Sequence, residues 1–345
     1  MTVIVSALRS PIGKYGGSLR DTTPEDLVST IMQNNLSSVG ISGDLVDEVI
    51  IGQTKQSAHS PNIARLALLK AGIPQNVPGH TVHMQCGSSM QAVINGAMSI
   101  MTRQNEVVLA GGVEVMSQAP YYFVGNRFGI RPGDLKMYDS NIESQPKSQP
   151  EKEYGRFTMG MTAENLAERY HISREEQDAF SLHSQEKAKI AIEQERFTEE
   201  IVPITVKEGK KGFRHFAVDE FPRDTSMEKL ANLKSVFKEN GTVTAGNSTG
   251  RNDGAAVLLL MSEQKAKEFG LKPLAHIRSF ASVGVDPKIM GIGPVPATKK
   301  ALELADLELN DIDLIELNEA FAAQSLAVLK EWGSDGTNVN VNGGA

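Results

Sequence analysis

The sequence of 345 residues contains one cysteine, Cys86, in the stretch VHMQCGSSMQAV. The pattern predicts a strand over 81–86 and a helix over 88–104, so Cys86 falls at a strand-to-helix junction. The N–H groups of a first helical turn and the helix dipole favour a thiolate, which is the nucleophilic form of cysteine. A free cysteine is also often a small buried apolar residue. From position alone, nucleophile and packing residue therefore both stay open.

A catalytic thiolate needs a partner base, and no histidine is well placed along the chain to serve Cys86. His83 is nearest, but three residues along a strand lead to the opposite face, so we interpret it as a satisfied structural histidine. The other histidines fall in loops or on polar helix faces, where we expect them to be solvated: His59, His80, His171, His183, His215 and His276. No metal-ligand spacing occurs, so we predict no metal. The glycine-rich stretches AGGVE and NGGA lack the context of a nucleotide-phosphate loop.

The elements that must position Cys86 alternate between strand and helix. The expected strands occupy 3–8, 47–53, 81–86 and 106–112. The expected helices occupy 24–40, 62–72 and 88–104. Such alternation predicts an α/β fold with a largely parallel sheet. A stretch rich in Gly, Pro, Ser and charge interrupts it from 118. A helix over 173–197 follows and opens with a capping box of Ser173 and Glu176.

The two ends of the chain share a short internal repeat. DLVDEVIIG (44–52) aligns without a gap with NDIDLIELN (310–318), apolar residue on apolar residue. We therefore predict two copies of one α/β unit at 1–117 and 241–345, with 118–240 inserted between them. The closing NVNVNGGA takes the place of the strand TVHMQC, so about forty residues are missing relative to a complete duplication.

A second stretch with chemical potential is ELNEAFAAQ (316–324), which puts the polar pair Asn318 and Glu319 at a helix start. Asparagine is a good N-cap, and capping alone would explain it. The repeat, however, places this turn beside the Cys86 turn across a pseudo-twofold axis. There an amide and a carboxylate could orient a water or hold an oxyanion.

Composition excludes several classes of function. The formal charge of −7 argues against general nucleic-acid binding. A lone cysteine forms no internal disulfide and fits a reducing compartment. The start MTVIVSALRSPIG lacks the basic and apolar regions of a signal peptide, and no apolar run approaches the roughly 18 residues of a membrane span. We expect a soluble cytoplasmic protein with no membrane or nucleic-acid partner.

Six motifs follow one another along essentially the whole chain: QCGSSMQAV, AGGVEVMSQAP, MGMTAENLAERYHISREEQDAFSLHSQEKA, GTVTAGNSTGRNDGAA, MGIGPVPATKKAL and IELNEAFAAQSLAVLKEW. Together they resemble the thiolases, the acetyl-CoA C-acetyltransferase family. The resemblance implies a duplicated α/β fold in helix–sheet–helix–sheet–helix layers, with a loop domain inserted in the first half. Ketoacyl synthases share a cysteine on a similar fold, but NEAFAAQ favours thiolase.

The resemblance also implies reversible Claisen chemistry on coenzyme A thioesters, with no further cofactor. Cys86 matches the cysteine that takes the acyl group, and a second acyl-CoA supplies the carbanion. Asn318 matches the asparagine that stabilises the enolate through a water, together with a histidine of a G-H-P motif. In the family a second cysteine, in a C-x-G motif, moves the proton.

Positions for substrate binding follow from the same resemblance. Arg223 and Ser226 match residues near the adenine end of coenzyme A, and Thr249 matches one near the pantetheine. The residues that match the lining of the acyl pocket are Met159, Met290 and Phe321. Family subunits pair their sheets edge to edge, which predicts a homodimer or homotetramer.

The sequence departs from the family pattern at several places. The G-H-P and C-x-G motifs do not follow NGGA. Loss of an oxyanion donor costs about 10²–10³ in rate, and loss of an acid/base group about 10²–10⁴ more. Ser89 stands where Gly is usual, Ser248–Thr249 where Ala-Ser is usual, and Thr158 where acetoacetyl-CoA-forming members often have His.

Two functions are therefore predicted as alternatives. The first is an acyl-CoA C-acyltransferase that forms or cleaves a 3-ketoacyl-CoA, with acetoacetyl-CoA foremost, through an acyl-cysteine. The second is a catalytically impaired thiolase-like protein that binds acyl-CoA or a partner without turnover.

Overall fold

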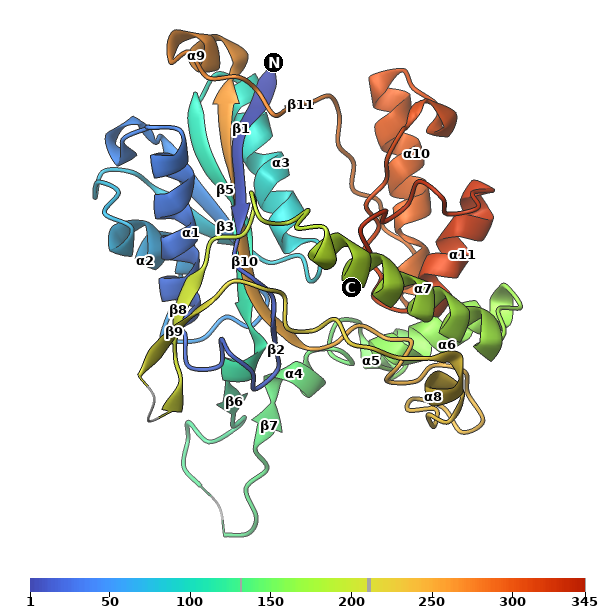
Figure 1. The fold of residues 1–345 in the computed structure, drawn as a ribbon. Helices are drawn as coiled ribbons and strands as arrows, with labels where there is room; N and C mark the ends of the chain where they lie inside the picture. The colour runs from blue at the N-terminus through green and yellow to red at the C-terminus, as the bar shows by residue number, and fades with distance from the viewer. Residues whose placement is uncertain (131, 210–211, 345) are drawn as a thin grey trace. The chain divides into compact units, whose positions relative to one another are not determined.

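A computed structural model describes residues 1–130, 132–209 and 212–344 and is drawn in Figure 1. The chain forms two compact units, each assembled from three stretches of sequence. Unit 1 comprises Met1–Ser140, Phe197–Phe221 and Arg251–Arg278. Unit 2 comprises Asn141–Arg196, Pro222–Gly250 and Ser279–Ala345.

Unit 1 is built on a seven-stranded sheet in the order β11-β1-β10-β5-β3-β4, with β2 paired to β10. The strands are β1 (Thr2–Arg9), β2 (Gly13–Lys14), β3 (Glu48–Gly52), β4 (Gly79–Val82), β5 (Val107–Val115), β10 (Asn252–Ser262) and β11 (Ala275–Ile277). β3 is parallel to both β4 and β5, whereas β10 is antiparallel to both β1 and β5. The predicted α/β class is confirmed. The prediction of a largely parallel sheet is wrong, because β1 pairs antiparallel with β10 and β11, and β10 pairs antiparallel with β5 and β2.

Helices cover both faces of this sheet (Figure 1). They are α1 (Pro24–Ser38), α2 (Ile63–Lys70), α3 (Ser88–Met101) and α9 (Glu263–Glu268), with 3₁₀ turns η1 (Gly43–Leu45) and η2 (Met116–Gln118). Side chains alternate across a strand, so each strand feeds two cores. In β5, Val107 and Leu109 join the core with α1 and α2, while Val108 and Ala110 join the core with α3. The helix α3 is thus seated on the sheet by its buried face.

Unit 1 also carries two short hairpins. One is β6 (Tyr121–Tyr122) with β7 (Tyr138–Asp139), and the other is β8 (Ile204–Lys207) with β9 (Phe213–Phe216).

Unit 2 is mainly helical. Its elements are α4 (Ser140–Glu143), α5 (Glu151–Tyr154), α6 (Met159–Arg169), α7 (Arg174–Glu193), α8 (Met227–Ala231), η4 (Pro287–Ile292), α10 (Pro294–Ala305), η5 (Leu309–Asp311) and α11 (Ala322–Trp332). Helix α11 packs against α6 and α7 around a core that contains Leu166, Ala327 and Val328. The capping box expected at the start of α7 is confirmed, because Ser173 and Glu176 each accept the other's backbone N–H.

The second copy of the repeat forms one parallel bridge, between Ile315 and Val339, among the described residues of unit 2. Ile315 N donates to Asn338 O over 3.0 Å, and Asn340 N donates to Ile315 O over 2.9 Å. This repeats the parallel pairing of β3 with β4. Residues 338–340 of the closing segment therefore pair beside the second copy as β4 pairs beside β3.

The compact units divide the chain differently from the predicted segments 1–117, 118–240 and 241–345. The strands β10 and β11 lie beyond residue 241, yet they pair within the sheet of unit 1. A sequence pattern can identify a buried strand such as β10, but it does not name the strand's partners. Among the helices that the structure describes, none has the length and apolar character needed to cross a bilayer.

Candidate active site

Cys86 lies in a tight turn of unit 1 and is exposed. The strand expected to reach 86 ends at Val82, and α3 begins at Ser88. Between them Gln85 adopts φ 47°, a left-handed conformation that costs a non-glycine residue about 1–2 kcal/mol. The sulfur therefore stands at the start of α3 on a strained turn, not on an extended strand.

The hydroxyl of Ser88 holds this turn together. Ser88 Oγ accepts a hydrogen bond from Met84 N over 2.9 Å and donates one to Gln85 O over 2.6 Å. One buried side chain thus fixes the backbone on both sides of the strained residue. Sequence reasoning missed this role, although a serine at the start of a helix after a tight turn is a known source of local side-chain-to-backbone bonds.

Glycines in the sheet let the start of α3 come close. A Cβ at Gly52 would lie 2.4 Å from the carbonyl carbon of Ser88, and a Cβ at Gly112 would lie 1.9 Å from Ser89 Oγ. Contacts this short are not tolerated, so β3 and β5 need glycine here. The AGGVE stretch therefore serves close packing beneath the Cys86 turn, where Ser89 occupies the space above Gly112.

His83 is exposed in the structure, so the prediction of a satisfied structural histidine is wrong. The strand ends one residue earlier, at Val82, and the alternation of faces along a strand no longer applies to His83.

Asn318 lies in unit 2, in the turn between the Ile315 bridge and α11, and is exposed. The side chain of Asn340 clamps both of its neighbours. Asn340 Oδ1 accepts from Leu317 N over 2.7 Å, while Asn340 Nδ2 donates to Leu317 O over 2.8 Å and to Glu319 Oε1 over 2.7 Å. The turn is thereby fixed while the amide of Asn318 faces outward.

Glu319 is buried and anchors the same turn from the other side. Its Oε2 accepts a hydrogen bond of 2.6 Å from Ser184 Oγ on α7. The carboxylate is therefore a structural acceptor here, and of the predicted polar pair only Asn318 is exposed. The roles of Asn340 and Ser184 were not foreseen, because neither residue is near Asn318 in sequence.

The segment that carries Thr249 lies alongside the Asn318 turn. Thr249 N donates to Ala320 O over 3.0 Å, and Ala322 N donates to Asn247 O over 3.0 Å. Ser248 and Phe321 form an antiparallel bridge. The structure therefore brings Thr249 and Phe321 together with the turn of Asn318, as one group of predicted site residues.

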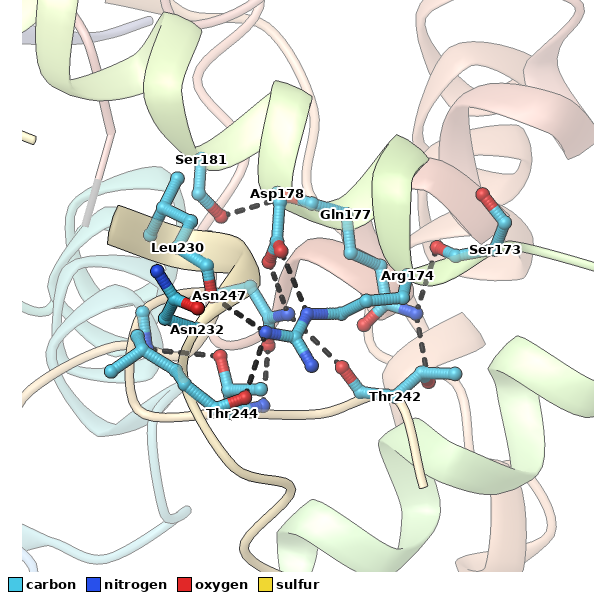
Figure 2. A network of polar contacts seen from close by, with 12 residues as sticks. Ser173, Arg174, Gln177, Asp178, Ser181, Leu230, Asn232, Thr242, Thr244 and Asn247 are labelled. Carbon is cyan, nitrogen blue, oxygen red and sulfur yellow. Dashed lines mark hydrogen bonds and ion pairs between the residues drawn. The ribbon is translucent and has the colours of Figure 1, made fainter. Parts of the chain in front are cut away.

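A buried polar network fixes this segment from the side of α7, as Figure 2 shows. Arg174 Nε donates to Asp178 Oδ2 over 2.7 Å, and Asp178 Oδ1 accepts from Asn247 Nδ2 over 2.9 Å. Asn247 Oδ1 in turn accepts from Thr244 N over 2.7 Å. In this ion pair the Asp178 side chain is almost fully buried. Removing Arg174 would therefore leave an unpaired buried charge, which is costly in free energy.

The same arginine also forms hydrogen bonds with the backbone at the end of α8 (Figure 2). Arg174 Nη2 donates to Leu230 O over 2.6 Å and to Leu233 O over 2.9 Å. Ser226 caps the start of α8 by accepting from Lys229 N over 3.3 Å. Arg223 reaches the Thr249 segment, since its Nη2 donates to Ala245 O over 3.3 Å. Arg223, Ser226 and Thr249 thus lie on segments that one network holds.

The predicted acyl-pocket residues belong to a common region of unit 2. Phe321 is buried in the core against which Met159 packs, and its ring meets Phe237 edge-on at 6.0 Å. A Cβ at Gly160 would lie 2.3 Å from the Phe237 ring, so this approach requires glycine. Met290 lies on η4, which packs against α6, the helix that begins at Met159.

Of the eight predicted site residues, Cys86 belongs to unit 1. The other seven belong to unit 2, namely Asn318, Arg223, Ser226, Thr249, Met159, Met290 and Phe321. Their roles in substrate binding and catalysis remain predictions.

Two family models match the chain in succession. The thiolase N-terminal domain matches residues 2–264, and the thiolase C-terminal domain matches residues 271–345. The chain is 49% identical over 344 residues to an acetyl-CoA acetyltransferase of Pseudomonas aeruginosa, covering 99% of this chain and 86% of that protein. It is 46% identical, with the same coverage, to a probable acetyl-CoA acyltransferase of Staphylococcus aureus.

Solved structures give the same result. The crystal structure of the Bacillus anthracis acetyl-CoA acetyltransferase matches with a TM-score of 0.95 at 49% identity, over 99% of this chain and 86% of that chain. Human mitochondrial 3-ketoacyl-CoA thiolase in complex with CoA matches with a TM-score of 0.94 at 43% identity, over 100% of this chain and 85% of that chain. These comparisons neither confirm the predicted loss of C-terminal residues nor support the alternative of an impaired protein. Because both family models match and the identity extends over nearly every residue, this chain belongs to the thiolase family.

Proposed function

We propose that this thiolase forms or cleaves a 3-ketoacyl-CoA, with acetoacetyl-CoA foremost, through an acyl-cysteine intermediate on Cys86. The observation that carries the proposal is the exposed cysteine at the start of α3, on a turn that one hydroxyl fixes. A helix of 14 residues directs the positive end of its dipole toward that sulfur. The thiolate form of a cysteine is the attacking species in such chemistry.

In the first half-reaction the Cys86 thiolate attacks the thioester carbonyl carbon of an acyl-CoA. A carbon–sulfur bond to Cys86 forms, the bond to the coenzyme A sulfur breaks, and coenzyme A leaves as a thiolate that takes up a proton. Splitting the reaction through a covalent intermediate replaces one difficult step by two easier ones. The turn must therefore expose the sulfur and hold it in place, and the Ser88 bonds support the second requirement because they fix the backbone of Met84 and Gln85 just before Cys86.

In the second half-reaction a second acyl-CoA loses a proton from its α-carbon to the surrounding water, and its thioester oxygen becomes an enolate oxygen. This proton balances the one that coenzyme A takes up in the first half-reaction. The carbanion attacks the acyl carbonyl, a carbon–carbon bond forms, and the Cys86 sulfur leaves. Asn318 is proposed to stabilise the enolate through a water, and the clamp by Asn340 supports this role because it fixes the turn without using the Asn318 amide. Preorganised donors of this kind are usually the largest electrostatic contribution to such catalysis.

We propose that coenzyme A binds along Arg223, Ser226 and Thr249. The hydrogen bond from Arg223 to Ala245 supports this, because it places the guanidinium on the segment that carries Thr249. The acyl group would lie against Met159, Met290 and Phe321, which cluster around α6 and η4. The reaction needs no cofactor beyond the thioester substrates.

A two-part experiment tests the proposal on the whole chain. The protein is incubated with acetoacetyl-CoA, the intact mass is measured for addition of one acetyl group, and release of acetyl-CoA on adding coenzyme A is assayed. An adduct that vanishes in Cys86→Ala, together with turnover, is expected. An adduct without turnover would favour the impaired alternative, and no adduct at all would reject Cys86 as the nucleophile.

We further propose a homodimer or homotetramer located in the cytoplasm. Support for the assembly comes from the edge-to-edge sheet pairing that the family resemblance implies. Light scattering of a folded sample is expected to give a mass of two or four chains, and a monomer would contradict it.

A further inference from the structure

Glu164 is a buried carboxylate of unit 2 that the proposed mechanism does not use. It lies on α6 and is 2% exposed. Thr242 N donates to both carboxylate oxygens over 3.0 Å, and Thr242 Oγ1 donates to Oε2 over 3.1 Å. Val243 N donates to Oε1 over 2.9 Å. Two successive backbone N–H groups and one hydroxyl thus form a cradle for a single carboxylate.

The backbone just before Thr242 passes directly over this carboxylate. A Cβ at Gly241 would lie 2.2 Å from Glu164 Oε1, so a larger residue at 241 would displace the carboxylate. Asn240, one residue earlier, adopts φ 54°, a left-handed conformation that asparagine tolerates better than most residues. The turn before Thr242 is therefore shaped to fit the carboxylate.

Gln177 fixes the direction in which the Thr242 hydroxyl donates. Gln177 Nε2, on α7, donates to Thr242 Oγ1 over 2.8 Å, and both side chains are drawn in Figure 2. A side-chain amide nitrogen is a donor only, so the hydroxyl proton is free to point to Glu164. The contact between hydroxyl and carboxylate is thereby oriented from two sides.

The residues that Glu164 holds are the start of the segment that carries Thr249. Asn247 Nδ2 donates to Thr242 O over 3.1 Å, which closes the segment on itself. Thr249 N donates to Ala320 O over 3.0 Å. The segment is therefore held at its start by the carboxylate, and at its end by the chain that follows the Asn318 turn.

Stability alone does not explain a carboxylate at position 164. Within the described residues its hydrogen-bond partners are backbone and hydroxyl groups, not a lysine or an arginine. Taking a carboxylate out of water costs free energy, which hydrogen bonds offset only in part. What the carboxylate supplies is direction, because its two oxygens fix three donors in one geometry.

We infer that Glu164 is a positioning residue for coenzyme A binding, which holds the segment 242–249 so that Thr249 meets the pantetheine. The inference rests on the proposed binding of coenzyme A along this segment. A site that is fixed before the ligand arrives binds more tightly, because less conformational freedom is lost on binding.

The catalytic turns have supports of their own. Asn340 clamps the Asn318 turn through Leu317, and the Cys86 turn is held by Ser88. Loss of Glu164 is therefore expected to weaken coenzyme A binding much more than it slows the chemical steps.

Glu164→Gln is the main variant, because it keeps the side-chain shape and replaces one acceptor oxygen by an amide group that faces N–H donors. Binding of coenzyme A to the whole chain is measured by isothermal titration calorimetry under reducing conditions. We expect the Kd to rise by about tenfold. In thiolysis of acetoacetyl-CoA, KM for coenzyme A should rise by a similar factor, while kcat changes by less than about threefold.

Glu168→Gln is the matched control. Glu168 lies one turn further along α6, is exposed, and pairs with Lys238 just before the same segment. Its Kd and KM are expected to equal those of the natural chain. An unchanged Kd in Glu164→Gln would overturn the inference. So would a loss of kcat at unchanged KM, because that would assign Glu164 to the chemical step.

Should Glu164→Gln fail to fold by circular dichroism, Thr242→Val replaces it. Valine nearly keeps the shape of threonine and removes only the hydroxyl donor, so the Kd should rise by about two- to threefold. An unchanged Kd in Thr242→Val would then overturn the inference.

Calorimetry with coenzyme A needs no turnover, so this test is separate from that of the proposed chemistry. If Glu164→Gln weakens binding while acetoacetyl-CoA leaves no adduct on Cys86, the proposed chemistry fails and the positioning role stands. If the natural chain forms the adduct but binds no coenzyme A in the calorimeter, the positioning role fails and acyl transfer to Cys86 stands.

Discussion

The Cys86 turn and the Asn318 turn are held in opposite ways. In the Cys86 turn, Ser88 bonds to Met84 and Gln85, four and three residues away. In the Asn318 turn, Leu317 is held by Asn340, 23 residues away, and Glu319 is held by Ser184, 135 residues away. The first turn is therefore encoded locally, and the second depends on segments assembled by tertiary folding.

β3 and the extended segment at Ile315 also differ in strand pairing and in burial. β3 has a parallel neighbour on each side, and Val49, Ile50 and Ile51 are at most 1% exposed. Ile315 is only half-buried, and Leu314 beside it is 65% exposed. A nucleophile must stay in place through covalent chemistry, and a buried central strand provides that rigidity. The Asn318 turn instead relies on hydrogen bonds of polar side chains, which single substitutions can remove.

The largest expected effect separates the chemistry of the two turns. Asn318→Ala should lower turnover of acetoacetyl-CoA by about 10²–10³, because the proposed contact to the enolate is lost. Acetylation of Cys86 by acetyl-CoA should continue, since that step expels the coenzyme A thiolate and forms no enolate. Asp313→Ala, an exposed change just before the bridge, is the control and should leave both steps unchanged. Equal loss of acetylation and turnover in Asn318→Ala would contradict the division of roles.

Stability provides the next largest contrast. Asn340→Ala removes three side-chain hydrogen bonds and puts alanine at φ 46°, where asparagine is tolerated. We expect a loss of about 2–4 kcal/mol in the free energy of unfolding, measured by urea denaturation. Native-state hydrogen exchange should be faster at the Leu317 amide and unchanged in β3.

Asn340→Gly keeps the backbone conformation free of strain and isolates the hydrogen-bond part of that loss. If Asn340→Gly proved as stable as the natural chain, the hydrogen bonds of Asn340 would make no contribution to the free energy of unfolding.

What could be predicted from the sequence follows the same division between local and distant contacts. The capping box of Ser173 and Glu176 was foreseen, because its partners lie within one helical turn. The strand β3 and the start of α3 were also foreseen, since apolar pattern and turn residues mark them within a short window. Asn340 and Ser184 carry no such signal, because their partners are chosen by the folded chain. The partners of β10 were missed for the same reason.

Ser88→Ala tests whether local bonding is what keeps the nucleophile in place. Both bonds to the strained Gln85 region are lost, and we expect Cys86 acetylation to slow by about tenfold as the sulfur samples unproductive positions. Stability should fall by only about 1–2 kcal/mol, since β3 still supports the turn. Ser99→Ala is the matched control, because Ser99 is on the same helix and its hydroxyl bonds only at the far end of it, donating to Gly96 O and accepting from Asn105 Nδ2. A tenfold loss in the control as well would assign the effect to α3 as a whole.

The smallest effect concerns charge at the start of α7, the helix that supplies Ser184 to the Asn318 turn. The backbone N–H of Ser173, followed by Lys330, lowers the pKa of Glu176. A lowered pKa in the folded state gives stability that is full above about pH 4.3, the unfolded value, and is lost as pH falls through the folded value. Glu176 is mostly exposed, so solvent screening limits the loss in Glu176→Gln to a few tenths of a kcal/mol near neutral pH, roughly the value of a surface pair.

The difference between Glu176→Gln and the natural chain should therefore disappear in acid, as measured by urea midpoints along a pH series. Glu175→Gln, in the same first turn but outside the capping box, should show a smaller difference at every pH. The pH dependence should appear in hydrogen exchange of α7 and not in β3, because the two elements belong to different compact units. An equal response in both regions would mean that the two turns unfold as one unit, and the contrast between local and distant support would not survive.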